Sequence, residues 1–308
     1  MKALIIRPGA LGDTLMLLPA LLDLTGKATI TFVGRQPGLG ILKNYVHSAM
    51  DLEGLGWHRL FTERKDIHGL PVPETDLVVA FFADRDGTIR NNLNRHLPHT
   101  PAYLFPSFPS EQEQIHVARY LAGCLRSAGL PVDPDRSIKA FLTGGLPQKA
   151  SAPSRQDKIV FHPGSGDPRK NHPPDLWLDL IGRLGQAIDF QVAGSIILLG
   201  PAEESIVPLF QKGLRPARAD IIFSPDSDTL VEILREAILY VGQDSGITHL
   251  AAMLGTPTIA LFKETNEHQW RPLGPHVKVI LEKEAGPALI NNVLQASVSL
   301  YSLLTTNH

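Results

Sequence analysis

The chain has 308 residues, of which 43% are hydrophobic and 19% are charged, as is ordinary for a globular protein. This composition excludes wholesale disorder, and the length predicts two domains. The formal net charge of −2 gives no global attraction to nucleic acid, so we expect no nucleic-acid partner. The single Cys124 excludes an intrachain disulfide and a cysteine-cluster metal site.

The apolar stretches near the N-terminus do not predict a signal or membrane segment. Residues 3–6 are too few for a signal peptide, and the run 14–24 contains Pro19 and Asp23. That run is also shorter than the about 20 apolar residues that span a bilayer. We therefore expect a cytoplasmic protein, with peripheral contact at the inner face of the inner membrane left open.

The first half alternates apolar runs with helical patterns, which favours a parallel sheet of Rossmann type. Strands are predicted at residues 2–7, 28–33, 59–61, 76–82 and 103–105. Helices are predicted at residues 14–24, 39–50 and 116–128, with Pro19 expected to kink or break the first. The polar, basic stretch 83–96 is expected to form a loop.

The second half repeats this alternation of predicted strands and helices. Strands are predicted at residues 159–161, 195–199, 221–223, 239–241, 258–262 and 277–280. Helices are expected at 175–184, after Glu204, after a capping box of Thr229 and Glu232, after Ser245 and at 288–304. The Gly-, Pro- and Ser-rich stretch 144–157 is typical of a linker. We therefore predict an α/β protein with Rossmann-like domains at residues 1–150 and 151–285, a terminal helix at 286–308, and ligands at the carboxyl ends of the strands.

Several familiar motifs are absent. Gly164-Ser165-Gly166 begins a dinucleotide fingerprint, but Arg169 replaces its last glycine. No phosphate-binding P-loop and no nucleophile elbow occur in the sequence. Asp84 and Asp86 follow a predicted strand, so they are either a metal–diphosphate site or part of a solvated loop.

Three loops of the second half instead predict a nucleotide-diphosphate site. The loop 162–171 combines glycines with Arg169 and Lys170, which could neutralise phosphate or form a solvated basic turn. Glu203 follows the next strand, where it could accept from ribose hydroxyls or complement a helix dipole. The third loop, Asp244-Ser245-Gly246, precedes a helix whose free N–H groups can hold an anion, with Thr248 and His249 one turn on. Its alternative is a simple helix cap.

Two features of the first half predict an acceptor site. Asp13 lies in a strand-to-helix turn, where a carboxylate could take a proton from an acceptor hydroxyl or cap the helix. Arg85, Arg90 and Arg95 could form a basic patch for an acidic acceptor, or could be a solvated face.

The order and spacing of three motifs resemble those of glycosyltransferase family 9, the lipopolysaccharide heptosyltransferases. The motifs are residues 9–13 with 18–21, residues 162–166 with 169–171, and residues 244–246 with 249–252 and 255–257. His172 and the pair Ile247-Thr248 depart from the usual family pattern, which bears on the identity of the sugar.

The resemblance implies a GT-B fold with two Rossmann-like domains facing across a cleft, the acceptor in the first and the sugar nucleotide in the second. It implies an inverting, metal-independent transfer, usually of heptose from ADP-heptose to a lipopolysaccharide core, with Asp13 as the base. No cofactor or metal is expected. The donor-binding residues that it implies, together with those of the loops above, are Ser165, Gly166, Arg169, Lys170, Glu203, Asp244, Ser245, Gly246, Thr248 and His249. The alternatives are a transferase for another nucleotide sugar, a sugar-nucleotide epimerase, a non-catalytic nucleotide-sugar-binding protein, and a metal-dependent transferase using Asp84 and Asp86.

Overall fold

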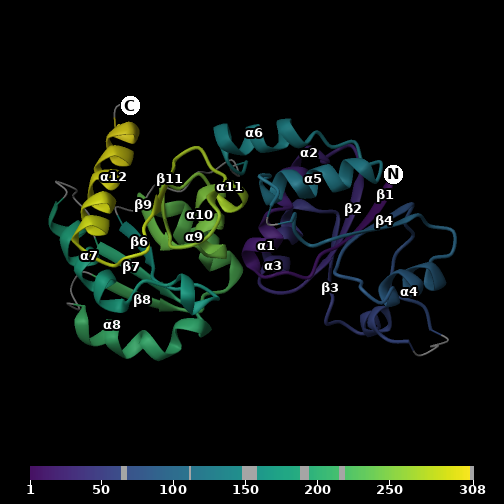
Figure 1. Cartoon of the computed structure of the whole chain (residues 1–308), viewed down its shortest axis with the longest axis horizontal. Helices are drawn as coiled ribbons and strands as arrows, with labels where there is room; N and C mark the ends of the chain where they lie inside the picture. The colour runs from purple at the N-terminus through teal and green to yellow at the C-terminus, as the bar shows by residue number, and fades with distance from the viewer. Residues whose placement is uncertain (64–67, 111, 148–157, 188–193, 215–218, 306–308) are drawn as a thin grey trace. The chain divides into compact units, whose positions relative to one another are not determined.

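The chain folds into two compact units, Met1–Ala140 and Phe141–His308 (Figure 1). The computed structural model describes residues 1–63, 68–110, 112–147, 158–187, 194–214 and 219–305. The predicted boundary between residues 150 and 151, with most of the predicted linker 144–157, lies outside these ranges. Within them, none of the helices has both the length and the apolar character that crossing a membrane requires.

The first unit is built on a five-stranded parallel sheet in the order β3-β2-β1-β4-β5. The strands are β1 (Lys2–Ile6), β2 (Thr29–Gly34), β3 (Ser48–Asp51), β4 (Leu77–Phe81) and β5 (Ala102–Phe105). The central strands are continuous apolar runs because both of their faces are covered, and every residue of β4 is buried. This continuity is what made β1 and β4 predictable from sequence.

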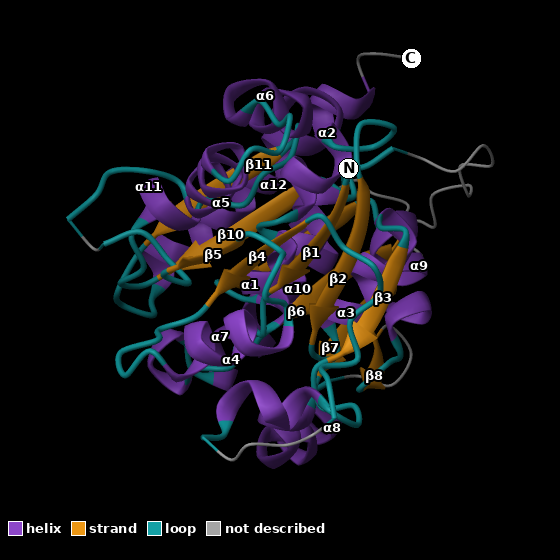
Figure 2. Cartoon of the chain, turned by 90° about the vertical axis from the view of Figure 1, so that its right-hand side faces the viewer, coloured by secondary structure: helices purple, strands orange, loops and turns teal. Residues whose placement is uncertain are grey.

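Helices connect these strands and flank the sheet (Figures 1 and 2). The connecting elements are α1 (Leu11–Leu15), α2 (Leu18–Asp23), α3 (Gly38–Leu42) and α4 (Thr88–His96), with 3₁₀ turns η1 (Lys43–Tyr45) and η2 (Trp57–Phe61). Helix α5 (Val117–Ser127) follows the last strand, and α6 (Pro134–Gly144) spans the boundary between the two units. The predicted helix 14–24 is interrupted between Leu15 and Leu18, and Pro19 lies in the first turn of the second piece. The expected break is confirmed, because proline is tolerated only in the first turn of a helix.

Three sequence-based expectations for this unit are wrong. Residues 59–61 lie in the 3₁₀ turn η2 rather than in a strand, with Trp57 and Leu60 buried. The predicted helix 39–50 ends early, and its last residues form the edge strand β3, because pairing with β2 overrides a weak helical pattern. The predicted loop 83–96 contains α4, which buries only Ile89, Asn92 and Leu93.

The second unit contains a six-stranded parallel sheet in the order β11-β10-β9-β6-β7-β8. The strands are β6 (Lys158–His162), β7 (Gly194–Leu199), β8 (Ala219–Phe223), β9 (Leu239–Gln243), β10 (Thr258–Phe262) and β11 (Val277–Leu281). Two parallel sheets flanked by helices confirm the predicted α/β class.

The helices of the second unit pack on this sheet around the buried Trp177. They are α7 (Pro174–Ala187), α8 (Val207–Gly213), α9 (Ser227–Glu236), α10 (Gly246–Met253), α11 (Glu267–Trp270) and α12 (Pro287–Thr305), with 3₁₀ turns η3 (Pro168–Lys170) and η4 (Pro201–Ile206). Helix α9 begins before the expected capping box, because the Asp226 carboxylate accepts from Thr229 N at 2.8 Å. Helix α12 packs against α7, β10 and β11. Its predicted contact with the first domain stays a prediction.

Candidate active site

The strand order of the second sheet defines where a ligand site is expected. After β6 the chain adds β7 and β8 on one side, and then returns to add β9, β10 and β11 on the other side. The carboxyl ends of β6 and β9 therefore flank the point where the strand order reverses, which is where open α/β sheets bind ligands. Because His162 is paired with Gly242, the loops that follow both strands start at the same level.

An ion pair joins these two loops. Lys170 Nζ lies 2.6 Å from Asp244 Oδ2, and the same oxygen accepts from Thr265 Oγ1 at 2.5 Å. The side chain of Asp244 is 4% exposed and that of Lys170 is 38% exposed. His249 Nε2 lies 3.9 Å from the other carboxylate oxygen, and its ring is buried beside Trp270. The loops after β6, β9 and β10 thus meet at one buried carboxylate.

Ser245 caps helix α10 and links it to β6. Its Oγ accepts from Thr248 N at 3.3 Å and lies 3.2 Å from His162 Nδ1. Burial lowers the pKa of His162 to about 4, so this imidazole is neutral at pH 7. The Thr248 hydroxyl is fully buried, donates to the carbonyl oxygen of Gln243 and lies 3.0 Å from Tyr240 Oη. The capping interpretation of Ser245 is confirmed, and binding of an anion by the first N–H groups of α10 stays a prediction.

The two cationic side chains of the loop between β6 and α7, those of Arg169 and Lys170, have different ion-pair partners. Arg169 pairs with Asp167 at 2.7 Å and its side chain is 87% exposed, whereas Lys170 faces Asp244. The Ser165 hydroxyl donates to Asn171 Oδ1 at 2.7 Å and is therefore engaged within the loop. Gly166 is exposed, with open space where a side chain would lie. Of the two predicted phosphate cations, only Lys170 belongs to the cluster around Asp244.

Glu203 is buried beneath this loop. Its Oε2 accepts from Gly200 N at 2.8 Å, and desolvation raises its pKa. A methyl group added at Gly164 would lie 2.0 Å from Glu203 Oε1, so the glycine is needed for this side chain to fit. Glu203 caps its own turn, and its role as a ribose ligand stays a prediction.

Three residues near the cluster were not among the predicted site residues. Gln243 bridges the loops when its amide group is turned so that the nitrogen donates to Lys170 O at 3.2 Å and the oxygen accepts from His172 N at 2.5 Å. Thr265 follows β10, so the rule that ligand sites lie at carboxyl ends of strands could have found it. His172 is buried; the sequence marks it only as a departure from the family pattern beside the 169–171 motif.

Asp13 lies at the corresponding reversal of the first sheet, between β1 and β4. It is the third residue of α1, and its Oδ2 accepts from Ala10 N at 3.2 Å. A side chain at Gly9 would lie 2.7 Å from Asp13 Cβ, so the turn closes tightly over the carboxylate. Asp13 therefore completes its own turn, from the third helical position rather than from the expected cap position, and its role as a base stays a prediction.

Arg85, Arg90 and Arg95 are all exposed, on α4 and the loop before it. Arg95 Nη1 donates to Asn92 Oδ1 at 2.8 Å. Because Arg90 and Arg95 are five residues apart, they point to different sides of the helix. Their role in acceptor binding stays a prediction.

The two acidic residues beside Arg85 cap helix α4. Asp84 accepts from Ile89 N at 2.9 Å and from Arg90 N at 3.0 Å, and Asp86 accepts from Thr88 N at 3.1 Å. Across the described ranges, no group of three or more His, Cys, Asp or Glu side chains could hold a metal ion. The capping contacts give these carboxylates a structural role.

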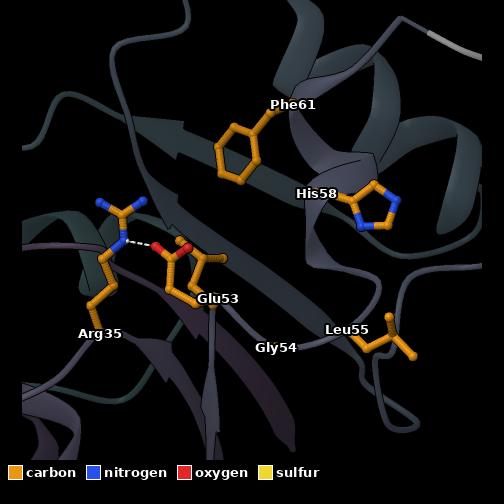
Figure 3. Close-up of a pocket in the computed structure, with 7 residues that line it drawn as sticks. Arg35, Glu53, Gly54, Leu55, His58 and Phe61 are labelled. Atoms are coloured by element: carbon orange, nitrogen blue, oxygen red, sulfur yellow. Dashed lines mark ion pairs between the residues drawn. The ribbon is translucent and has the colours of Figure 1, made fainter.

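A pocket of about 360 Å³ opens elsewhere on the carboxyl edge of the first sheet, beyond β2 and β3 (Figure 3). The Arg35–Glu53 ion pair, with 2.6 Å between Nε and Oε1, lies on one side, and the Phe61 ring and His58 lie across from it. None of the predicted acceptor residues lines this pocket.

Comparison with known proteins identifies the family. The sequence profile of glycosyltransferase family 9 (heptosyltransferase) matches residues 98–292, which is more than half of the chain. The chain belongs to glycosyltransferase family 9. The matched range includes the cluster around Asp244 but not the turn that carries Asp13. A search of curated protein sequences gives no significant match.

Solved structures of this family share the fold. The E. coli ADP-heptose lipopolysaccharide heptosyltransferase II is 17% identical, with a TM-score of 0.72 over 99% of this chain and 100% of its own. E. coli heptosyltransferase WaaC, solved with ADP, is 19% identical, with a TM-score of 0.66 over 97% and 100%. A family 9 enzyme from Veillonella parvula DSM 2008 is 16% identical, with a TM-score of 0.67 over 97% of each chain. The predicted GT-B fold of the family 9 chain is confirmed.

Proposed function

We propose that this family 9 glycosyltransferase transfers heptose from ADP-heptose to a lipopolysaccharide core or a related glycan, with inversion. The observation that carries the proposal is the Lys170–Asp244 pair beside the capped start of α10, at the strand-order reversal of the second sheet. The similar WaaC was solved with ADP and with ADP-2-deoxy-2-fluoro heptose, which supports an ADP-sugar donor.

On the donor side, the diphosphate lies at the N-terminus of α10. The N–H groups after Ser245 and the ammonium group of Lys170 stabilise the negative charge that grows on the leaving ADP. Losing one such electrostatic contact typically lowers the rate ~10²–10³-fold. Glu203 accepts from ribose hydroxyls in this scheme, and the transfer uses no metal and no cofactor.

On the acceptor side, Asp13 removes the proton from the attacking hydroxyl. The oxygen then attacks the anomeric carbon opposite the departing ADP, and the attack inverts the configuration. General-base help of this kind is worth roughly 10²–10⁴-fold in rate. Arg85, Arg90 and Arg95 hold acidic groups of the acceptor, and the reaction takes place in the cytoplasm at the inner face of the inner membrane.

The first experiment is a binding screen of the purified protein against ADP-, UDP-, GDP- and CDP-sugars by calorimetry. We expect ADP-heptose to bind best. Preference for another nucleotide would contradict the proposed donor. Incubation with donor alone tests the epimerase alternative, which predicts a new sugar nucleotide without any acceptor.

The second experiment measures transfer from ADP-heptose to deacylated lipopolysaccharide core oligosaccharide. Asp13→Asn is expected to lower kcat by ~10²–10⁴-fold while leaving donor affinity unchanged. Asp135→Asn is a matched control, because Asp135 is also an acidic residue in the first turn of a helix and is highly exposed. Normal turnover by Asp13→Asn would remove Asp13 from the mechanism, and binding without any transfer by the unaltered chain would favour a binding protein.

A further inference from the structure

Arg7 is a buried arginine directly after β1, at the strand-order reversal of the first sheet. It is 1% exposed, and it follows three fully buried apolar residues of the strand. Its backbone N–H still continues the sheet by donating to Val33 O at 2.9 Å. The guanidinium group therefore lies beneath the turn that contains Asp13, and not at the surface.

The guanidinium group connects two loops of the first unit. Arg7 Nε donates to Asp13 O at 3.0 Å, and Nη1 donates to Ser107 O at 2.7 Å. Its Cζ lies 5.4 Å from the ring centroid of Phe81 and 5.2 Å from that of Phe108, within the range of cation–π attraction. The turn after β1 and the segment after β5 are thus fixed to each other through a single side chain.

Stability alone does not explain a charge at this position. Nη2 is buried and has no hydrogen-bond partner among the residues that the structure describes. Desolvation lowers the pKa of Arg7 to about 10, against the opposing effect of the Asp13 carboxylate, so the group stays charged at pH 7. Burying a guanidinium group is costly unless its donors are hydrogen-bonded, so a buried donor without a partner in the described part of the chain makes this charge a poor stabilising device.

We propose that Arg7 is a positioning residue for the transfer reaction, which fixes the turn carrying Asp13 and places a permanent positive charge beneath it. The inference rests on the proposed role of Asp13 as the base. Arginine suits this task because its planar fork reaches two carbonyl groups at once while its faces pack on aromatic rings. Lysine has one terminal nitrogen and cannot reproduce that geometry.

A positioning role differs from a purely structural one in its kinetic signature. Misplacing a catalytic group by about 1 Å can cost ~10²-fold in rate. Arg7→Met is therefore expected to lower kcat about 10²-fold with the donor KM changed less than about 2-fold. A structural defect would instead lower the amount of folded protein, and kcat per folded molecule would be unchanged.

The test measures transfer from ADP-heptose to deacylated core oligosaccharide, by Arg7→Met and Arg7→Lys, each with and without Asp13→Asn. If Arg7 acts through Asp13, Arg7→Met costs less than about 3-fold in the Asp13→Asn background, because effects of residues that act together are not additive. Arg7→Lys is expected to recover only part of the lost rate. Arg119→Met is the control, since Arg119 is a half-exposed arginine paired with Asp135.

Phe108→Leu keeps the test decisive if Arg7→Met does not fold. Phe108 is 39% exposed, so its replacement disturbs the core little while removing one ring from the guanidinium group. We expect Phe108→Leu to lower kcat about 3- to 10-fold when Asp13 is present, and to have little effect in the Asp13→Asn background. Unchanged kcat in both Arg7→Met and Phe108→Leu, or equal losses with and without Asp13, would overturn the inference. Wild-type transfer by Asp13→Asn alone would instead contradict the proposed function.

Discussion

Replacing Gly164 by alanine tests how tightly the loop after β6 is built over Glu203. The added methyl carbon would lie 2.0 Å from Glu203 Oε1, 2.1 Å from Cδ and 2.2 Å from Cγ. Non-bonded atoms normally approach to about 3.5 Å, so the carboxyl group must move by roughly 1.5 Å. Movement breaks the 2.8 Å hydrogen bond from Gly200 N to Oε2.

The expected destabilisation follows from these contacts. Overpacking costs about 1–3 kcal/mol, and loss of a hydrogen bond to a charged group costs about 1.5–3 kcal/mol. Movement of the Glu203 carboxyl group toward water recovers part of this lost free energy, because its raised pKa shows that burial disfavours its charged form. We expect Gly164→Ala to lower the free energy of unfolding by about 2–4 kcal/mol.

Urea unfolding followed by tryptophan fluorescence measures this change, with Trp177 reporting on the core of the second unit. Gly166→Ala is the matched control, because no atom lies within 4 Å of its added methyl group. Glu203→Ala removes all three clashing atoms and costs about 1.5–3 kcal/mol through loss of the same hydrogen bond. The double variant Gly164→Ala with Glu203→Ala should therefore be nearly as stable as Glu203→Ala alone. Full additivity of the two losses, or an unchanged Gly164→Ala protein, would refute the reasoning.

Three further predictions concern charged and titrating groups. Lys170→Met leaves the buried Asp244 carboxylate without its cation, so the free energy of unfolding should fall by about 1–2 kcal/mol. Calorimetry should also show weaker binding of ADP. Equal ADP affinity would exclude Lys170 from the site. His162 has a pKa of about 4 when folded and about 6.5 when unfolded, so only the unfolded state gains this proton as pH falls through that window. Stability should drop by up to about 3 kcal/mol between pH 6.5 and 4, and the slope should flatten in His162→Asn. Asp84→Ala should lower the stability measured by thermal unfolding by about 1 kcal/mol, because the cap of α4 is lost. A chelator should leave the transfer rate of the unaltered protein unchanged. Loss of activity with chelator would favour the metal-dependent alternative.

The strands and the ligand-binding edges of the sheets could be predicted because continuous apolar runs mark buried parallel strands in the sequence. Doubly buried parallel strands must be apolar throughout, and their carboxyl ends bring loops together wherever the strand order reverses. Lys170 and Asp244 were both predicted from loops that follow such strands, although 74 residues separate them. What the sequence could not supply was their direct pairing, since the register of β6 against β9 is set by tertiary packing.

The predictions of secondary structure and burial were wrong where the hydrophobic pattern of the sequence is weak. Helix α4 has few apolar residues, and it is held by Asn92, whose amide donates to Leu60 O and Thr62 O across a gap of about thirty residues. The edge strand β3 is half exposed and lacks the apolar run that marks β1. Arg7 was read as the last residue of a strand, because nothing in its neighbours indicates that its charge is buried between two aromatic rings.

The Lys170–Asp244 ion pair bears on which anions the second unit can select. A free lysine loses about 2 kcal/mol of rotational freedom when a ligand immobilises it, but Lys170 is already held at 2.6 Å from a buried carboxylate. Ligand binding therefore meets an ammonium group that is pre-ordered and whose charge is partly neutralised. A small monoanion gains little from such a group, whereas a diphosphate carries enough charge to share the lysine and still occupy the helix terminus. We therefore expect this internal pairing to disfavour small monoanions relative to a diphosphate group, such as that of the proposed donor.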